Sequence, residues 1–554
     1  MRRHSQLQKP GFSKWIMPWG VAFLLAYGPV LAQEVLPDTK IPESQEIETP
    51  HDQGKGNDSG RTTAKDIDRD AENSQSSRSQ QMDAAYARPP ITEVAKTTSH
   101  SLEVRGETIV YEATAGTLTI RDDKGMPTAS VFYVAYTVAH EDDQPRPVTF
   151  FYNGGPGSAS LWLHMGSFGP VRAKTDEPKS LGSPPYELET NSETLIDKTD
   201  MVFIDAVGTG YSRPLDGTGM DEFTGVDQDA EAFSRAIIRY VTLNKRWNAP
   251  KFLLGESYGA TRSAVVANLL ESRGVAVNGA ILLSPILDYT VLDRDRYYVN
   301  MLPTYAAAAW YHDKVVNKPE NLEDFIQQAR EFSGDTYVQA LAEGDLISEA
   351  KANEVAQQMS HFIGLSAAYL LQSNLRVPEW RFRKELLRDQ RLTIGRFDAR
   401  YTGMDEDAAG GRAGMDPSET AVKGAYHALL RDYLVRMLEY DSDLDYRVLH
   451  QGEVGEWDWS HNRHQSPKAT VDLSEVIRKN PHFKVISLNG YYDLATPFLG
   501  TEYDLSHLSL EPVLRQNISI RYYPSGHMIY LNPDALAEMR NDVVEFLEEA
   551  IGDR

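Results

Sequence analysis

The stretch Phe252-Leu253-Leu254-Gly255-Glu256-Ser257-Tyr258-Gly259-Ala260 decides how the rest of the chain is organised. An apolar run ends there in Gly-x-Ser-x-Gly, and a helical pattern continues from Thr261 to Leu270. Glycines on both sides of Ser257 permit strained dihedrals, so a strand can turn sharply into a helix and present the hydroxyl at the helix N-terminus. The helix dipole and the free N–H groups there favour developing negative charge. Gly-x-Ser-x-Gly alone is common, but the strand before it and the helix after it favour a catalytic Ser257.

Composition limits the class of protein. With 554 residues, of which 41% are hydrophobic, the chain can bury one large core or a core with a sizeable insertion. A formal net charge of -24 favours solubility and predicts no nucleic-acid partner. The sequence contains no cysteine, which excludes thiol catalysis, disulfides and cysteine-ligated metal.

The N-terminal segment has the pattern of a secretory signal peptide. Basic residues precede an apolar stretch at 15–32, which closes on Val30-Leu31-Ala32. We expect residues 1–32 to be a signal peptide cut after Ala32; an uncleaved anchor is the alternative, and membrane contact is expected only in that case. Residues 33–88 are polar without a hydrophobic period, which predicts a disordered linker or tether. Export without disulfides favours a bacterial periplasm or exterior.

Strand patterns begin near residue 91. Four short strands are expected at 101–105, 108–112, 116–120 and 129–136, and the turn residues between them predict an antiparallel meander at the sheet edge. Apolar strands then alternate with helices, which predicts a mostly parallel sheet with helices on both faces. The strands expected in that part are 148–152, 201–205, 252–254, 279–285, 484–490 and 518–523, and the helices are 230–241, 261–270 and 533–550.

This alternation stops between residues 288 and 480, where helical patterns dominate. We expect a mostly helical cap inserted above the active site there. The predicted organisation is therefore an α/β core in two parts, 89–287 and 481–554, which the cap at 288–480 interrupts.

A nucleophilic serine needs a base to accept its proton and a carboxylate to orient that base. Asp493 lies in a turn just after the expected strand 484–490, and His527 lies in the turn after 518–523. Loops that follow adjacent parallel strands reach the same sheet edge, where Ser257 also lies. The alternatives are a turn carboxylate that bonds its own backbone for Asp493 and an ordinary loop histidine for His527. His507 is the main competitor, but it lies away from a strand end.

Five motifs together resemble the serine carboxypeptidases, a family with the α/β-hydrolase fold, and they occur in the family's order. The resemblance runs from about Leu102 to the C-terminus and is weakest in the cap. The motifs are Asn153-Gly154-Gly155-Pro156-Gly157-Ser158, Val207-Gly208-Thr209-Gly210-Tyr211-Ser212, Gly255-Glu256-Ser257-Tyr258-Gly259, the Asp493 turn and Ser525-Gly526-His527-Met528.

The resemblance implies a role for each matching residue. It implies that Ser257 is the nucleophile, that His527 is the general base and then acid, and that Asp493 orients His527. It also implies that the backbone N–H groups of Gly155 and Tyr258 form the oxyanion hole. For Tyr258 the same role follows from its position directly after the elbow serine.

The resemblance further implies that Asn153 and Glu256 hold the free C-terminal carboxylate of the substrate. A glutamate beside a bound carboxylate must carry a proton to donate a hydrogen bond, so its pKa should be raised and binding should be best at acid pH. The alternative for Glu256 is a residue that caps the elbow helix. The chain departs from the family at Ser158, where a cysteine is common, and at Ser167, where a second glutamate usually supports the first. That support is lost here or replaced by a hydroxyl.

We therefore expect an exported serine carboxypeptidase that acts on peptides with a free C-terminus through an acyl-enzyme and needs no cofactor. An esterase or acyltransferase on the same scaffold is the nearest alternative, and a non-catalytic binding protein is a further one. Trp457 and Trp459 could line a substrate pocket, but a cap core or a surface loop is the favoured interpretation. His461 and His464, together with Asp458, have a spacing that could meet a metal on a helix, but no outside ligand is evident and no metal is expected.

Overall fold

A computed structural model describes residues 92–139, 146–176, 178–292, 294–450 and 457–552. The predicted signal peptide at 1–32 and the predicted linker at 33–88 lie outside the described residues. Of the helices within the described ranges, none is long and apolar enough to cross a bilayer.

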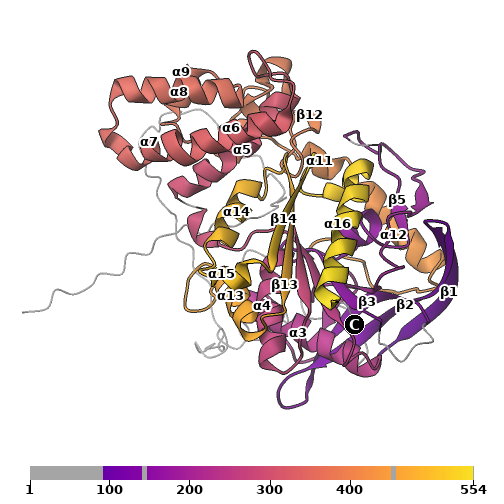
Figure 1. Cartoon of the computed structure of the whole chain (residues 1–554). Coiled ribbons are helices and arrows are strands. Elements are labelled where there is room, and N and C mark those ends of the chain that lie inside the picture. The colour runs from indigo at the N-terminus through magenta and orange to yellow at the C-terminus, as the bar shows by residue number, and fades with distance from the viewer. Residues whose placement is uncertain (1–91, 140–145, 177, 293, 451–456, 553–554) are drawn as a thin grey trace, which may run out of the picture. The chain divides into compact units, whose positions relative to one another are not determined.

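A mixed sheet of ten strands forms the centre of the described chain (Figure 1). The strand order is β1-β2-β3-β7-β4-β9-β10-β13-β14, and β8 pairs with β3. Neighbouring strands are antiparallel from β1 to β7 and parallel from β7 to β14, which confirms the predicted meander and the predicted mostly parallel sheet. The strands are β1 (Ala95–Val104), β2 (Glu107–Arg121), β3 (Pro127–Thr137), β4 (Val148–Tyr152), β7 (Asp200–Ile204), β8 (Arg213–Pro214), β9 (Lys251–Glu256), β10 (Gly279–Leu283), β13 (Lys484–Gly490) and β14 (Ile518–Tyr523).

One detail of the meander prediction is wrong. The strands expected at 108–112 and 116–120 form the single strand β2. The reason is pairing on both sides: β1 pairs with β2 as far as Gly116, and β3 pairs with it from Glu112 onward, so the segment between has a partner on each edge. Gly116 also permits close approach, because a Cβ there would lie 2.6 Å from the carbonyl oxygen of Val94.

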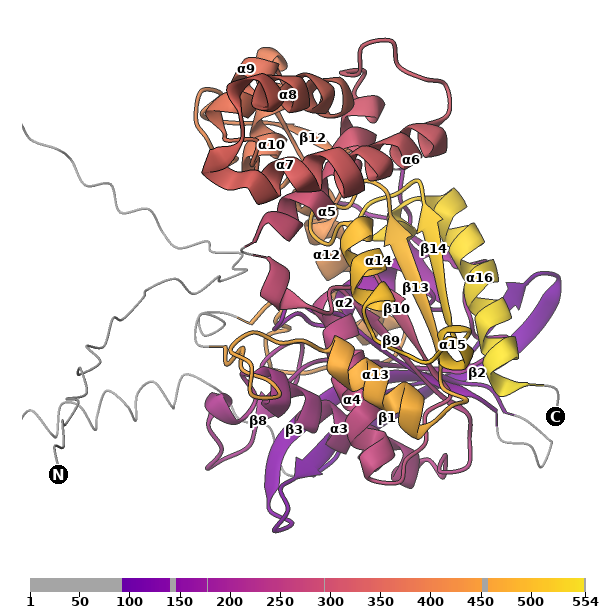
Figure 2. The ribbon, with the colours of Figure 1, turned by 60° about the vertical axis from the view of Figure 1, so that its left-hand side comes forward.

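Helices cover both faces of the sheet (Figure 2). Because successive side chains of a strand point to opposite faces, Phe252 and Leu254 of β9 lie in the core under α16, whereas Leu253 lies in the core under α3, α4 and α13. The helices of these layers are α2 (Leu161–Gly166), α12 (Lys423–Arg436) and α16 (Pro533–Ile551) on the first side, and α3 (Val226–Leu243), α4 (Tyr258–Ser272) and α13 (Thr470–Lys479) on the second.

The segment predicted as a cap has two parts, and they pack in different places. Its first part builds a separate hydrophobic core, which also includes Tyr491 and Leu494 from the loop after β13 and Phe498 from the start of the helix that follows. Its last part, with α12 and α13, packs on the helices of the sheet. The division at 288 and 480 itself stays a prediction. The first part contains α5 (Asp295–Tyr311), α6 (Leu322–Phe332), α7 (Val338–Glu343), α8 (Glu349–Ile363), α9 (Ala367–Gln372), α10 (Glu379–Glu385), β11 (Leu392–Ile394), β12 (Thr402–Met404) and α11 (Pro417–Thr420).

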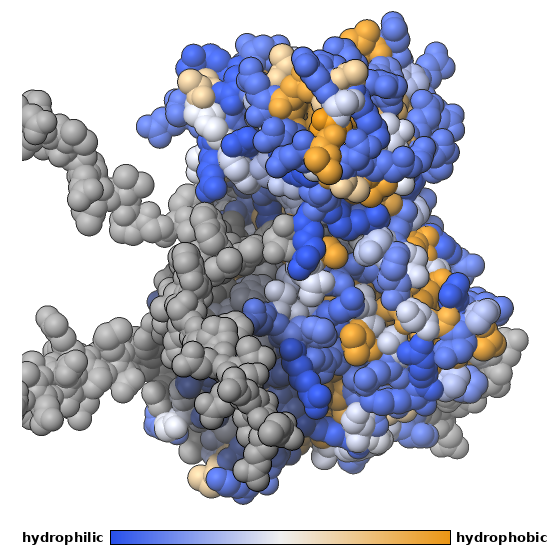
Figure 3. Space-filling view, turned by 90° about the vertical axis from the view of Figure 1, so that its left-hand side faces the viewer, coloured by the Kyte–Doolittle hydropathy of each residue, from blue (hydrophilic) through white to orange (hydrophobic). Residues whose placement is uncertain are grey.

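Smaller elements complete the described chain: β5 (Val171–Ala173), β6 (Leu188–Thr190), α14 (Phe498–Ser506) and α15 (Pro512–Arg515). Hydrophilic residues predominate on the face in Figure 3, and the hydrophobic ones lie in small groups among them. Such a surface suits the strongly negative net charge of the chain.

Candidate active site

The predicted strand, turn and helix around Ser257 are present. Ser257 joins β9 to α4 with φ 62° and ψ -125°, a strained conformation of a kind that clusters at active sites. Both flanking glycines are required by packing. A Cβ on Gly255 would lie 2.0 Å from the carbonyl oxygen of Gly259, and a Cβ on Gly259 would lie 2.9 Å from that of Tyr152. The elbow therefore presents a partly exposed serine at the N-terminus of a helix.

The candidate residues lie at or just after the carboxyl ends of neighbouring parallel strands, and Glu256 is the last residue of β9. Asn153 follows β4, Ser257 follows β9, Asp493 comes after β13 and His527 comes after β14. Because these strands are parallel neighbours, with only β10 between β9 and β13, the same edge of the sheet carries Asn153, Ser257, Asp493 and His527.

Asp493 and His527 are in direct contact. His527 Nδ1 lies 2.7 Å from Asp493 Oδ2, and both side chains are buried. The other carboxylate oxygen, Oδ1, accepts hydrogen bonds from the backbone N–H groups of Ala495 and Thr496 at 2.8 and 3.0 Å. The Thr496 hydroxyl lies 2.6 Å from Oδ2. Thr496 was not predicted, although a threonine three residues after a turn aspartate is a common source of such a bond.

The pair controls the charge of the imidazole. Burial opposes the positive charge of His527, but the Asp493 carboxylate and its hydrogen bond outweigh burial and raise the pKa of His527. A carboxylate on Nδ1 fixes the tautomer that leaves Nε2 free to accept a proton. The arrangement is suited to general-base chemistry.

Ser257 and His527 are linked through β10. Leu283, the last residue of β10, accepts a hydrogen bond from the Ser257 N–H at 2.9 Å, and the next residue, Ser284, donates its hydroxyl to the His527 carbonyl at 2.7 Å. Over the described ranges, no hydrogen bond joins the Ser257 hydroxyl to His527. Such bonds are often long without substrate and tighten in the Michaelis complex.

The Asn-Gly-Gly loop lies directly on the elbow. A Cβ at Gly154 would lie 2.5 Å from the backbone nitrogens of both Tyr258 and Gly259, so only glycine fits. Within the part of the chain that the structure describes, the N–H groups of Gly155 and Tyr258 donate to no protein acceptor. Two free backbone donors are what an oxyanion hole beside the candidate nucleophile Ser257 requires.

A buried ion pair fixes this loop from below. The Arg262 guanidinium, on α4, donates two hydrogen bonds to Asp229 of α3, at 2.7 and 3.1 Å. It donates a third hydrogen bond to the Asn153 carbonyl at 2.6 Å. Its guanidinium also lies 4.1 Å from the ring centroid of Phe233. The prediction from sequence missed Arg262, although a charge in the middle of a small-residue helix after the elbow is a signal for a buried partner.

Asn153 and Glu256 form the second contact among the candidate residues. Asn153 Nδ2 donates to Glu256 Oε2 at 2.9 Å, and the Tyr530 hydroxyl donates to the same oxygen at 2.9 Å. Burial raises the pKa of Glu256 to about 7, while the charge on His527 and these two hydrogen bonds oppose the rise. The Ser167 hydroxyl instead bonds the Leu163 carbonyl at 2.6 Å. The hydroxyl that supports Glu256 therefore comes from Tyr530, which no sequence pattern indicated.

The competing residues lie elsewhere. His507 is exposed at the end of α14 and bonds the Tyr503 carbonyl at 2.7 Å. His461 bonds two carboxylates, Asp227 through Nδ1 at 2.5 Å and Asp472 through Nε2 at 2.6 Å, which raises its pKa to about 9 despite burial. Its two ring nitrogens are therefore occupied by protein, and the described residues contain no group of three or more that could hold a metal ion.

Trp457 and Trp459 both pack near Tyr258, with ring centroids 5.6 and 6.2 Å from that of Tyr258. Trp457 is buried in the core under α3, α4 and α13, and Trp459 packs against that core. The tryptophan pair therefore packs in the core between the sheet and these helices, and not in the separate core of the insertion.

Comparison with known proteins gives the same family as the motifs. The family model described as serine carboxypeptidase matches residues 106–522. Serine carboxypeptidase-like 33 of Arabidopsis thaliana is 22% identical over 171 residues, which are 29% of this chain and 34% of that protein; the chain thus matches about a third of this curated relative's length.

Two solved structures can be set beside these matches. One is a prohormone-processing carboxypeptidase from Saccharomyces cerevisiae, with 15% identity, coverage of 78% of this chain and 91% of that chain, and a TM-score of 0.49. The other is a proline iminopeptidase from Mycobacterium smegmatis, with 14% identity, coverage of 78% and 98%, and a TM-score of 0.33. The mostly parallel sheet, the elbow and the match over residues 106–522 identify an α/β-hydrolase fold, and the chain belongs to the serine carboxypeptidase family.

Proposed function

We propose that this protein is an exported serine carboxypeptidase that removes the C-terminal residue of peptides through an acyl-enzyme. The observation that carries the proposal is the buried Asn153–Glu256 pair, which lies next to Ser257 at the same sheet edge as the Asp493–His527 pair. A serine nucleophile with a neighbouring carboxyl that holds a proton near neutral pH is suited to a substrate that ends in a carboxylate.

In this proposal, acylation begins with proton transfer from the Ser257 hydroxyl to His527 Nε2 as the oxygen attacks the carbonyl of the last peptide bond. The N–H groups of Gly155 and Tyr258 stabilise the oxyanion, each contributing about 3 kcal/mol. His527 then gives its proton to the leaving nitrogen, and the C–N bond breaks. The C-terminal amino acid departs, and the rest of the peptide stays bound to Ser257 as an ester.

Deacylation repeats these steps with water. His527 takes a proton from the water molecule, the resulting tetrahedral species collapses, and the proton returns to the Ser257 oxygen. Throughout acylation, Asn153 Nδ2 and protonated Glu256 donate hydrogen bonds to the carboxylate of the departing residue. This contact orients the last peptide bond against Ser257. The free energy of binding the terminal carboxylate thereby lowers the barrier to the chemical step.

Products identify the activity. Purified protein is incubated with a blocked dipeptide, and also with the ester of the same acyl group, in the presence of an amino-acid amide as a competing acceptor. The proposal predicts release of the free C-terminal amino acid and one partition ratio between hydrolysis and transfer for both substrates, because they share an acyl-enzyme.

Ser257→Ala should abolish both reactions, and Ser272→Ala, which removes an exposed hydroxyl from the same helix, should leave them unchanged. Normal turnover by Ser257→Ala, or partition ratios that differ between the leaving groups, would contradict the proposed mechanism.

A further inference from the structure

A segment of the helical insertion contacts both turns that carry the candidate residues Asp493 and His527. The Arg396 carbonyl accepts a hydrogen bond from Leu494 N–H at 3.0 Å, directly after Asp493. The Phe397 carbonyl accepts from the His527 N–H at 2.6 Å, and the rings of Phe397 and His527 lie 5.2 Å apart. Residues 396–397 therefore form part of the wall of the Asp493–His527 pair.

The packing at this contact is tight. A Cβ on Gly526 would lie 2.4 Å from both the Phe397 carbonyl oxygen and Asp398 Cβ, so the glycine before His527 is needed to admit the segment. Arg400, farther along the segment, bonds the Pro524 carbonyl and the Ser525 hydroxyl at 2.9 and 3.1 Å. The insertion thus contacts each residue of the turn from Pro524 to His527.

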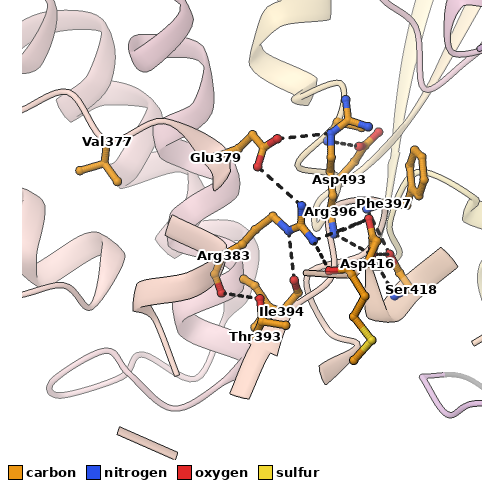
Figure 4. A network of polar contacts seen from close by, with 12 residues as sticks. Val377, Glu379, Arg383, Thr393, Ile394, Arg396, Phe397, Asp416, Ser418 and Asp493 are labelled. Atoms are coloured by element: carbon orange, nitrogen blue, oxygen red, sulfur yellow. Dashed lines mark hydrogen bonds and ion pairs between the residues drawn. The ribbon is translucent and has the colours of Figure 1, made fainter. Parts of the chain in front are cut away.

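Arg396 brings a positive charge to this wall. Figure 4 shows its side chain pointing toward Asp493, with Glu379 on the other side of its charged end. Arg396 Nε lies 3.4 Å from Glu379 Oε1, and both side chains are only 19% exposed. The Arg396 N–H lies 3.1 Å from each carboxylate oxygen of Asp416, which fixes the backbone from which the side chain extends.

A second arginine stabilises this arrangement. Arg383 donates to the carbonyls of Ile394 and Met415 at 3.1 and 3.2 Å, and its guanidinium lies within 4 Å of Glu379 and Asp416 (Figure 4). Glu379 is thereby held between two arginines. The geometry of Arg396 relative to Asp493 is thus set by the insertion, not by the sheet.

We propose that Arg396 is a positioning residue for the reaction: its charge beside Asp493, balanced by Glu379, adjusts how readily His527 takes a proton. The inference rests on the proposed function for its catalytic consequence. The charged groups that face His527 are Asp493, Glu256 and Arg396, and the first two favour the imidazolium while Arg396 opposes it. Asp398 and Arg400 also lie near this turn, but they form an ion pair at 2.5 Å, so their charges offset each other.

The two partners have opposite predicted effects. Arg396→Gln removes a positive charge, so the pKa of His527 should rise by about one unit, as expected for a partly buried charge several ångströms away. Glu379→Gln leaves the arginine uncompensated, so the pKa of His527 should fall. The double variant should return toward the starting value. If the two substitutions acted only through lost packing, the pKa of His527 would not shift in opposite directions in the two variants.

The test measures the His527 pKa by NMR in protein with labelled histidine, with the signal assigned by its loss in His527→Asn. All variants carry Glu256→Gln, so that the neighbouring carboxyl does not titrate. The acid limb of kcat/KM for an N-acylated ester is measured in parallel and should move in the same directions. Arg376→Gln is the matched control, because it removes an arginine that forms two hydrogen bonds with Asp295 in the same insertion.

Shifts of opposite sign for Arg396→Gln and Glu379→Gln, with none for Arg376→Gln, would support the inference. Shifts of the same sign, or none in either variant, would overturn it. The NMR measurement needs no turnover, so it decides the inference even if hydrolysis by Ser257→Ala were to refute the proposed function.

Discussion

Replacing Glu256 by glutamine should stabilise the protein at alkaline pH. Burial holds the pKa of the Glu256 carboxyl at about 7, above the 4.5 of a free glutamate, so the folded protein binds this proton more tightly than the unfolded chain. The stability that comes from this proton is fully present below about pH 4.5 and is lost as pH rises to about 7. The difference between the two pKa values corresponds to about 3 kcal/mol.

Glu256→Gln keeps an oxygen that can accept from Asn153 and Tyr530 but removes the ionisation. The free energy of unfolding in urea should therefore fall between pH 4.5 and pH 8 by about 3 kcal/mol less in the variant than in the wild type. Glu354→Gln, at an exposed position on α8, is the matched control and should leave the pH dependence unchanged. Equal pH dependence in Glu256→Gln and wild type would refute a buried carboxyl with a raised pKa.

Three further changes probe the proposed machinery. Ser257→Ala should lose labelling by a fluorophosphonate while keeping its circular dichroism spectrum; a labelled variant would exclude Ser257 as the nucleophile. Thr496→Val removes a hydroxyl 2.6 Å from Asp493 and should lower kcat about tenfold in steady-state assays, and an unchanged kcat would show that Asp493 needs no such support. Gly154→Ala places a methyl group against the Tyr258 nitrogen and should lower kcat about a hundredfold; full activity would argue against this loop as part of the oxyanion hole.

The fold could be predicted from the sequence where the hydrophobic pattern is typical of a single kind of element. The runs at 252–254 and 279–283 are apolar on both faces, which is typical of a buried parallel strand, and each lies at the centre of the sheet. The pattern was misleading at Ala113-Thr114-Ala115, where small residues resemble a break between strands. Pairing on both edges keeps β2 continuous there, and pairing is not a property of the local sequence.

For the site, the motifs named residues that the structure brings to one edge, but not the residues that hold them. Asp493 and His527 lie in contact, as do Asn153 and Glu256, and their roles stay predictions. Tyr530 could not have been predicted, because nothing in the residues after His527 requires a phenol to turn back toward Glu256. Residues 396 and 397 lie 98 and 130 residues before Leu494 and His527, with which their carbonyls bond, and they belong to the part of the chain where the family resemblance is weakest.

The most direct test of the proposed function compares a blocked dipeptide with its C-terminal amide across the range from pH 4.5 to 9. The account predicts that the free acid is strongly preferred at acid pH, and that its KM rises toward that of the amide as pH passes about 7, where Glu256 loses its proton. In Glu256→Gln this rise should disappear. Equal KM values for acid and amide at every pH would contradict the carboxylate site and leave an esterase or acyltransferase as the activity of this fold.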